Sequence, residues 1–186
     1  MYKRQAHGLP IIGRERIARV LNDVARALES LVDQTLAMMN AGAPLDKILH
    51  TVAVPADLAG RPYLQATYDE PEFVVRNIWR LYGGWWDGDA ANLKPAPASE
   101  LASEIASLAG GAGLLIDRAV SLSEAGQHRL ACHLADFAAR AADSPDLHAK
   151  RAEVYTRRRE GERSLMAQGI FRAAAEESAA RAGPDA

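Results

Sequence analysis

Helical spacing of apolar residues is the feature that most constrains this chain of 186 residues. Apolar side chains recur every three or four positions through most of the sequence, alanine is abundant, and β-branched residues are sparse after position 95. This spacing is typical of amphipathic α-helices, whereas a half-buried strand would alternate apolar and polar residues. The sequence therefore predicts an all-α fold, and its length suffices for one domain with a core.

Glycine, proline and capping residues divide the helical pattern into segments. Asn40-Ala-Gly42 ends a first long helix, Asp69 with Pro71 begins a later one, and Ser99 and Ser144 can cap two more. We expect helices over residues 14–41, 44–49, 71–82, 99–109, 112–125, 127–142, 145–160 and 164–181. Several prolines leave residues 50–71 as an irregular link.

The breaks after residue 99 predict how the later helices are arranged. They fall at Gly110-Gly111, at Gly126 and at Asp143-Ser-Pro145, so that consecutive helices form pairs. Two such pairs resemble antiparallel hairpins stacked in the tetratricopeptide manner, although no 34-residue consensus repeat is present. We therefore expect a helical bundle of stacked antiparallel hairpins.

Apolar stripes on two of the expected helices predict their buried faces. The stripe of the first helix contains Ile17, Leu21, Val24, Leu28, Leu31, Thr35 and Met38. The stripe of the 71–82 helix contains Phe73, Ile78, Leu81 and Tyr82.

Charge and cysteine content exclude several classes of function. The formal net charge is -2, so neither nucleic acid nor an anionic membrane is expected as the main partner. No apolar run approaches the roughly twenty residues that span a bilayer. The single Cys132 rules out an internal disulfide and a cysteine-based zinc site, which suits a reducing compartment and makes the cytoplasm our working expectation.

The histidines and the arginine run favour structural roles. His133 lies beside an apolar helical stripe, which is typical of a hydrogen-bonded packing residue, and we expect His50, His128 and His148 at helix ends or exposed turns. Arg157-Arg158-Arg159 splay around a helix, so they predict a salt-bridged, solvated face rather than a phosphate clamp.

An aromatic cluster offers two readings. All three tryptophans fall within eight positions, and the cluster consists of Trp79, Tyr82, Trp85 and Trp86. Large aromatic side chains dominate both protein interfaces and cores, so dimer contact and core packing are equally compatible with the pattern. Gly83-Gly84 and Gly88 are expected to supply positive φ angles in the following turn.

A long stretch of the chain resembles a known family. The segment YDEPEFVVRNIWRLYGGWWDGDAANLKPAPASELASEIASLAGG, followed by RLACHLADFAARAA and AEVYTRRREGERSLMAQGIFRAAA, resembles the alkyl sulfatase dimerisation domain. In zinc-dependent alkyl sulfatases this domain follows a catalytic domain of the metallo-β-lactamase type. The resemblance covers residues 14–175 and implies a helical module that associates with a second copy of itself.

The resemblance also implies particular site residues. Family enzymes hydrolyse alkyl sulfate esters to an alcohol and sulfate at a centre of two zinc ions. By correspondence, His7 matches the last zinc-binding histidine, and Tyr68 matches a tyrosine near the substrate sulfate. Family members carry a His-Asn pair where this chain has Phe73-Val74. One histidine cannot hold zinc tightly, so we do not expect this chain alone to bind the metal or to catalyse the reaction.

The domain limits follow from the same resemblance. Residues 6–13 are expected to be the remnant of a metallo-β-lactamase-type domain, residues 14–175 the dimerisation domain, and residues 176–186 a flexible tail. Residues 1–5, MYKRQ, are similar to the translation of a sequencing adapter, so we exclude them from the fold. The leading hypothesis is therefore the dimerisation module of an alkyl sulfatase. The alternative is a free-standing helical interaction protein without catalysis.

Overall fold

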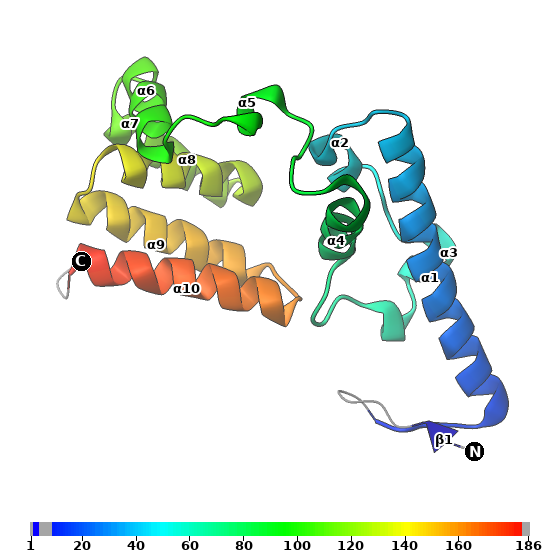
Figure 1. Ribbon diagram of the computed structural model, residues 1–186. Helices are drawn as coiled ribbons and strands as arrows, with labels where there is room; N and C mark the ends of the chain where they lie inside the picture. Colours follow the sequence, from blue (N-terminus) through cyan, green and yellow to red (C-terminus); the bar gives the residue numbers. More distant parts are fainter. Residues whose placement is uncertain (1, 4–8, 184–186) are drawn as a thin grey trace. The chain divides into compact units, whose positions relative to one another are not determined.

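A computed structural model describes residues 2–3 and 9–183 of the chain (Figure 1). The described residues form ten α-helices, one short 3-10 helix and two strands of two residues each. This architecture confirms the predicted all-α class. The chain divides into two compact units, residues 1–93 and residues 94–186, where the sequence analysis expected one helical domain.

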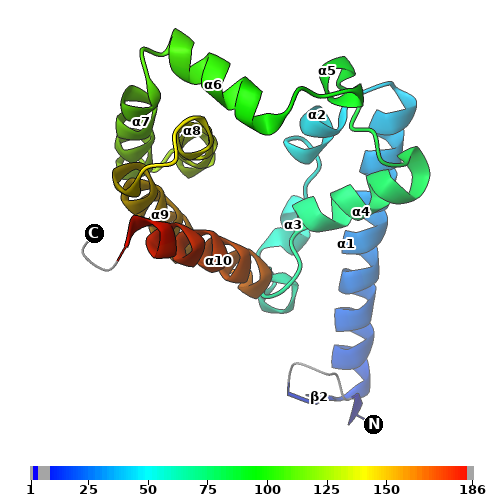
Figure 2. The same cartoon turned by 60° about the vertical axis from the view of Figure 1, so that its left-hand side comes forward.

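The first unit is built around a long helix. Its elements are β1 (Tyr2–Lys3), β2 (Ile11–Ile12), α1 (Arg14–Asn40), α2 (Leu45–Leu49), α3 (Ala56–Ala59), η1 (Pro62–Leu64), α4 (Pro71–Gly83) and α5 (Ala90–Leu93). The two strands pair antiparallel, and α4 crosses α1 (Figure 2) and also packs on α2. The buried core contains Leu31, Ile48, Leu49, Val52 and Val75. Packing of α2 and α4 on α1 therefore sets the position of the loop and of α5, which follow α4 within this unit.

The buried face of α1 differs from the predicted stripe. Its buried residues are Val20, Asp23, Ala27, Leu31 and Thr35. Leu21 and Leu28, which the stripe placed in the core, are exposed. Adjacent residues on a helix point about 100° apart. A stripe predicted one position away from the true one therefore faces a different direction. The covering elements lie on the Val20 and Ala27 side, which the spacing alone does not reveal.

A polar clamp ties α1 to the link that the sequence analysis left irregular. The hydroxyl of Tyr63 donates a hydrogen bond to Oδ2 of the buried Asp23 at 2.6 Å, and Nε of Arg61 lies 3.5 Å from the same oxygen. The hydrogen bond to this carboxylate raises the pKa of the Tyr63 hydroxyl. Nearby, Arg26 pairs with Asp57 at 3.0 Å. These bonds hold α3 and η1, which together span residues 56–64, against α1.

The second unit contains five helices. They are α6 (Ala98–Leu108), α7 (Ala112–Glu124), α8 (His128–Ala141), α9 (Pro145–Glu160) and α10 (Leu165–Ala182). Each packs on its neighbour from α7 to α10, and α6 also packs on α8, as predicted for stacked hairpins (Figure 1). The core is rich in alanine, including Ala119, Ala131 and Ala135. Small side chains at these positions let the helices approach closely.

A buried polar network crosses three of these helices. Nε of Arg151 on α9 donates to Oδ1 of Asp136 on α8 at 2.8 Å, and Nη1 donates to the Ser178 hydroxyl on α10. The Tyr155 hydroxyl donates to the same Asp136 oxygen at 3.0 Å. Burial, together with the Asp136 charge, raises the pKa of Tyr155, so its hydroxyl remains a donor at neutral pH. These bonds fix how α8, α9 and α10 are aligned along one another.

The helix limits agree with prediction to within about two residues, the uncertainty usual for helix ends, but the caps agree less well. The helices expected to begin near Asp69 and Ser99 have Glu70 and Pro97 at their N-caps. Ser144 occupies its predicted N-cap position without a side-chain bond. Helix α10 continues to Ala182, so residues 176–182, expected in the tail, are helical.

Among the helices of the described residues, none alone is long and apolar enough to cross a bilayer, although the bent pair α6 and α7 passes that test together.

Candidate self-association surface

The end of α4 presents large apolar side chains to solvent. Leu81 is 75% exposed, Tyr82 60% and Trp85 77%, and Trp86 is also exposed. We call these four residues the α4 apolar patch. The sequence analysis placed Leu81 and Tyr82 in the core, which is wrong. Ile78 is buried, as predicted, and Val75 lies with it on the covered side of α4, where Trp79 is partly buried.

The tryptophans have different roles in this region. Trp79 packs against the core, and its indole Nε1 donates a hydrogen bond to the carbonyl of Trp86 at 2.9 Å. The Nε1 of Trp86 donates to the carbonyl of Asp89 at 2.8 Å. Trp85 is the most exposed of the three and extends into solvent. Core packing therefore accounts for Trp79, whereas Trp85 is exposed and its part in dimer contact stays a prediction.

Two glycines shape the loop that carries Trp85 and Trp86. Gly84 and Gly88 have φ angles of 84° and 91°, as predicted. Gly83 was also expected to have a positive φ, but it remains the last residue of α4. At Gly88, a Cβ atom would lie only 3.2 Å from the Cα of Pro44. Glycine is therefore required there both for the turn and for the close approach of the loop to α2.

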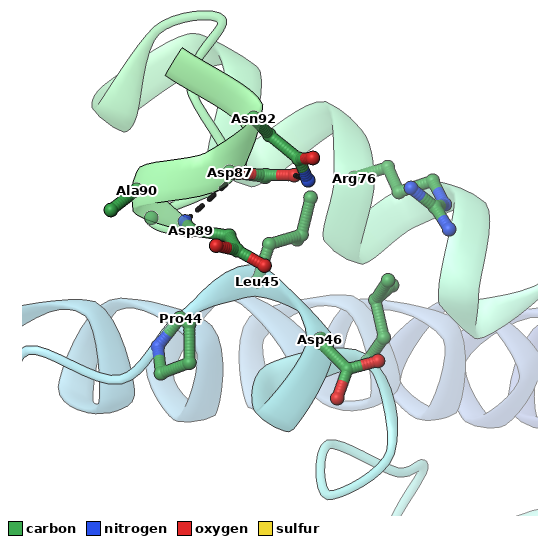
Figure 3. A pocket seen from close by; sticks show the side chains of 10 residues that line it. Pro44, Leu45, Asp46, Arg76, Asp87, Asp89, Ala90 and Asn92 are labelled. Carbon is green, nitrogen blue, oxygen red and sulfur yellow. Dashed lines mark hydrogen bonds between the residues drawn. The ribbon is translucent and has the colours of Figure 1, made fainter. Parts of the chain in front are cut away.

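Asp87 is the centre of the loop's hydrogen bonds (Figure 3). Its Oδ1 accepts from the backbone N–H of Asp89 at 3.0 Å, and its Oδ2 accepts from Nδ2 of Asn92 at 2.6 Å. Its backbone carbonyl accepts from the N–H of Leu45 at 2.9 Å. The backbone bond from Asp89, followed by the bond from Asn92, holds the pKa of the Asp87 carboxyl below its ordinary value. Asp87 therefore fixes the loop at neutral pH.

A hollow of about 650 Å³ lies beside this loop, between it, α2 and α4 (Figure 3). Asp46, Asp87, Asp89 and Arg76 contribute its charged groups, and Leu45 and Leu49 are among its apolar ones. Its lining is therefore mixed.

Of the two residues singled out for sulfate and metal contact, the structure describes only Tyr68. Tyr68 lies in the segment before α4, and its side chain is 42% exposed. His7 lies outside the described residues. Between residues 9 and 183, no group of three or more His, Cys, Asp or Glu side chains is arranged to hold a metal ion. The roles of Tyr68 and His7 therefore remain predictions.

The remaining histidines have mixed positions. His133 is exposed, rather than packed as expected. His148 lies in the first turn of α9, at a helix end as expected, but it is only 4% exposed, and its Nε2 lies 2.7 Å from Oδ1 of Asp143. His50 lies at the end of α2, 3.5 Å from Asp46.

The arginine run forms salt bridges, as its spacing predicted, but Arg158 and its partner Glu162 are mostly buried, so this part of the face is not solvated as expected. Arg157 pairs with Glu153 at 2.6 Å, and Arg158 pairs with Glu162 while its guanidinium lies over the Phe171 ring. Near this face, burial raises the pKa of Cys132 to about 11, so its thiol stays protonated at neutral pH. A protonated thiol is a poor nucleophile.

Comparison with known proteins finds similarity to one part of several alkyl sulfatases. The family described as alkyl sulfatase dimerisation matches residues 45–181. A linear primary-alkylsulfatase of a Pseudomonas strain is 34% identical over 160 residues, which is 86% of this chain and 30% of that protein. An alkyl/aryl-sulfatase of Saccharomyces cerevisiae is 28% identical over 66% of this chain and 19% of its own length. The chain thus spans less than a third of the length of these relatives.

A solved structure shows the same fold. The stereoselective inverting sec-alkylsulfatase Pisa1 from Pseudomonas sp. superposes with a TM-score of 0.84 and 24% sequence identity. The match covers 94% of this chain and 28% of that one. Since the family match spans most of the chain and agrees with the helical architecture, the chain belongs to the alkyl sulfatase dimerisation family.

Proposed function

We propose that this chain is the self-association module of a larger alkyl sulfatase, and that a second copy docks on the α4 apolar patch. The observation that carries the proposal is the exposure of Leu81, Tyr82 and Trp85 on one short stretch. Exposed apolar clusters mark interaction sites, and aromatic residues supply a large share of binding energy at protein interfaces. Because the chain belongs to a dimerisation family, the partner that we propose is a second copy of the chain.

Replacing Trp85 by alanine tests this surface. We expect the dissociation constant of the self-associated chain to rise about 30-fold, because a central aromatic contact contributes about 2 kcal/mol or more. The indole of Trp85 is not part of the α4 core, so the fold should remain intact. A dilution series followed by sedimentation velocity measures the constant, and far-UV circular dichroism checks the helices.

A matched control uses Leu165 on α10, which is 48% exposed but lies outside the patch. Leu165→Ala should leave the dissociation constant within about three-fold of the original value, as expected for a residue away from the binding hot spot. An equal loss in both variants, or no loss in Trp85→Ala, would contradict the assignment of the α4 apolar patch.

The activity of the larger enzyme is also part of the proposal. Relatives named as alkylsulfatases suggest hydrolysis of alkyl sulfate esters to an alcohol and sulfate. The resemblance implies a centre of two zinc ions, with His7 as one ligand. The described residues do not build such a centre, so we assign no catalytic step to them.

Tyr68 is proposed to contact the sulfate group of the substrate. Replacing Tyr68 by phenylalanine removes only the hydroxyl, which would donate a hydrogen bond to a sulfate oxygen. In an alkyl sulfatase that contains this chain, Tyr68→Phe should lower sulfate release about ten-fold or more, as loss of one charge-stabilising donor does in other enzymes. Unchanged turnover on several alkyl sulfates would refute the role.

A further inference from the structure

We propose that Asp87 is a positioning residue for self-association, because its bonds hold residues 84–92, the loop after α4 with the start of α5, in the shape that presents Trp85. This inference rests on the proposed function. It adds to that proposal a residue, Asp87, that shapes the surface on which the second copy would dock. Asp87 itself need not touch the partner.

The loop is fixed at both ends and in the middle. At its start, the carbonyl of Trp86 is held by Nε1 of Trp79, whose ring packs against the core of the first unit. In the middle, the Asp87 carboxylate accepts one hydrogen bond from the N–H of Asp89 and another from the side chain of Asn92. The Asp87 carbonyl binds the backbone of α2 through the N–H of Leu45. Every one of these bonds lies within residues 1–93, so the first unit alone shapes the surface.

The Asp87 carboxylate binds the loop itself rather than a basic side chain. Both of its oxygens accept hydrogen bonds from residues of the same loop, at 3.0 Å and 2.6 Å. A charged acceptor that joins two points of a short loop restricts the conformations that the loop can adopt. Trp85 lies two residues before Asp87, so this restriction limits the positions open to its indole.

Restricting an exposed aromatic before binding strengthens association. A side chain that is already ordered loses less conformational entropy when the partner arrives. If Asp87 acts in this way, its removal weakens self-association without affecting the helical core. A residue that only stabilised the fold would instead lower thermal stability and association together.

Two substitutions at Asp87 separate these possibilities. Asp87→Ala removes both side-chain bonds and should raise the dissociation constant of the self-associated chain about ten-fold. Asp87→Asn keeps an acceptor for the Asp89 N–H, and rotation of the Asn92 amide allows its second bond to re-form. Asp87→Asn should therefore stay within about three-fold of the original constant. Asp33→Ala, which removes an exposed carboxylate on α1, is the charge control and should leave the constant unchanged.

Loop order is measured in the same variants by near-UV circular dichroism. All three tryptophans lie in the first unit, and two of them belong to this loop. The near-UV signal should fall in Asp87→Ala and recover in Asp87→Asn, with the thermal midpoint of the helices retained in both. If Asp87→Ala reduces helicity, Asn92→Ala removes one bond only and should weaken association about three-fold.

The possible results distinguish the two proposals. A wild-type chain that remains monomeric overturns the proposed function and this inference with it. Self-association that is lost in Trp85→Ala but unchanged in Asp87→Ala overturns the positioning role alone. Weakening in Asp87→Ala that tracks a fall in thermal midpoint, or that Asp87→Asn does not relieve, also overturns it.

Discussion

Replacing Arg151 by alanine is expected to lower the free energy of unfolding by about 3 kcal/mol, because the change leaves buried polar groups without their partner. Arg151 bonds Asp136 on α8 at 2.8 Å, and it also donates to the Ser178 hydroxyl and to the Ala174 carbonyl on α10. The hydroxyl of Ser178 is fully buried, and Asp136 is mostly so. Urea unfolding followed by far-UV circular dichroism measures the loss.

Arg140 provides the control for this prediction. It pairs with the other oxygen of Asp136 at 3.1 Å, but its side chain is half exposed. Exposed pairs contribute up to about 1 kcal/mol, so Arg140→Ala should have a much smaller effect. A loss in Arg151→Ala of only about 1 kcal/mol, the upper limit expected for Arg140→Ala, would contradict the stabilising role of the bonds from Arg151 to α8 and α10.

Replacing Ile48 by alanine is expected to cost about 3 kcal/mol in the first unit, through the lost burial and the cavity that remains. Ile48 on α2 is fully buried in a cluster with Leu31 and Val75, which come from α1 and α4. Since every tryptophan lies in this unit, tryptophan fluorescence during urea unfolding reports on it selectively.

Ile170 is the matched control for Ile48. It has the same side chain on α10 but is 62% exposed. Ile170→Ala should change stability by less than about 0.5 kcal/mol, as is usual for surface positions. A fluorescence transition in Ile48→Ala that coincides with the original one would contradict the packing of α2 between α1 and α4.

The helices themselves could be predicted from the sequence, because their ends are marked locally. Gly42 has a φ angle of 77° at the end of α1, and Pro145 begins α9, as the residue types indicated. The short elements α3, η1 and α5 were missed. Their residues carry no long apolar period, and the bonds that hold the link, such as Tyr63 to Asp23, join positions 40 residues apart.

The exposed surface could be predicted only in part. The aromatic cluster was identified from its density, yet periodicity alone does not reveal which turn of α4 lacks a covering element. Asp23 on α1 and Asp136 on α8 were both missed, because an acidic residue on a helix usually faces water. Their burial depends on a tyrosine or an arginine supplied by another element. Asp87 was not singled out, although it lies in the turn that the glycines predicted, because its bond to Asn92 exists only in the folded loop.

The claim that matters most is that the chain associates with a second copy of itself. Sedimentation equilibrium of the wild-type chain at micromolar concentrations tests it most directly. We predict a mass near twice the 20.1 kDa of one chain, falling toward one chain on dilution and in Trp85→Ala. A mass of one chain throughout this concentration range would contradict the proposed function.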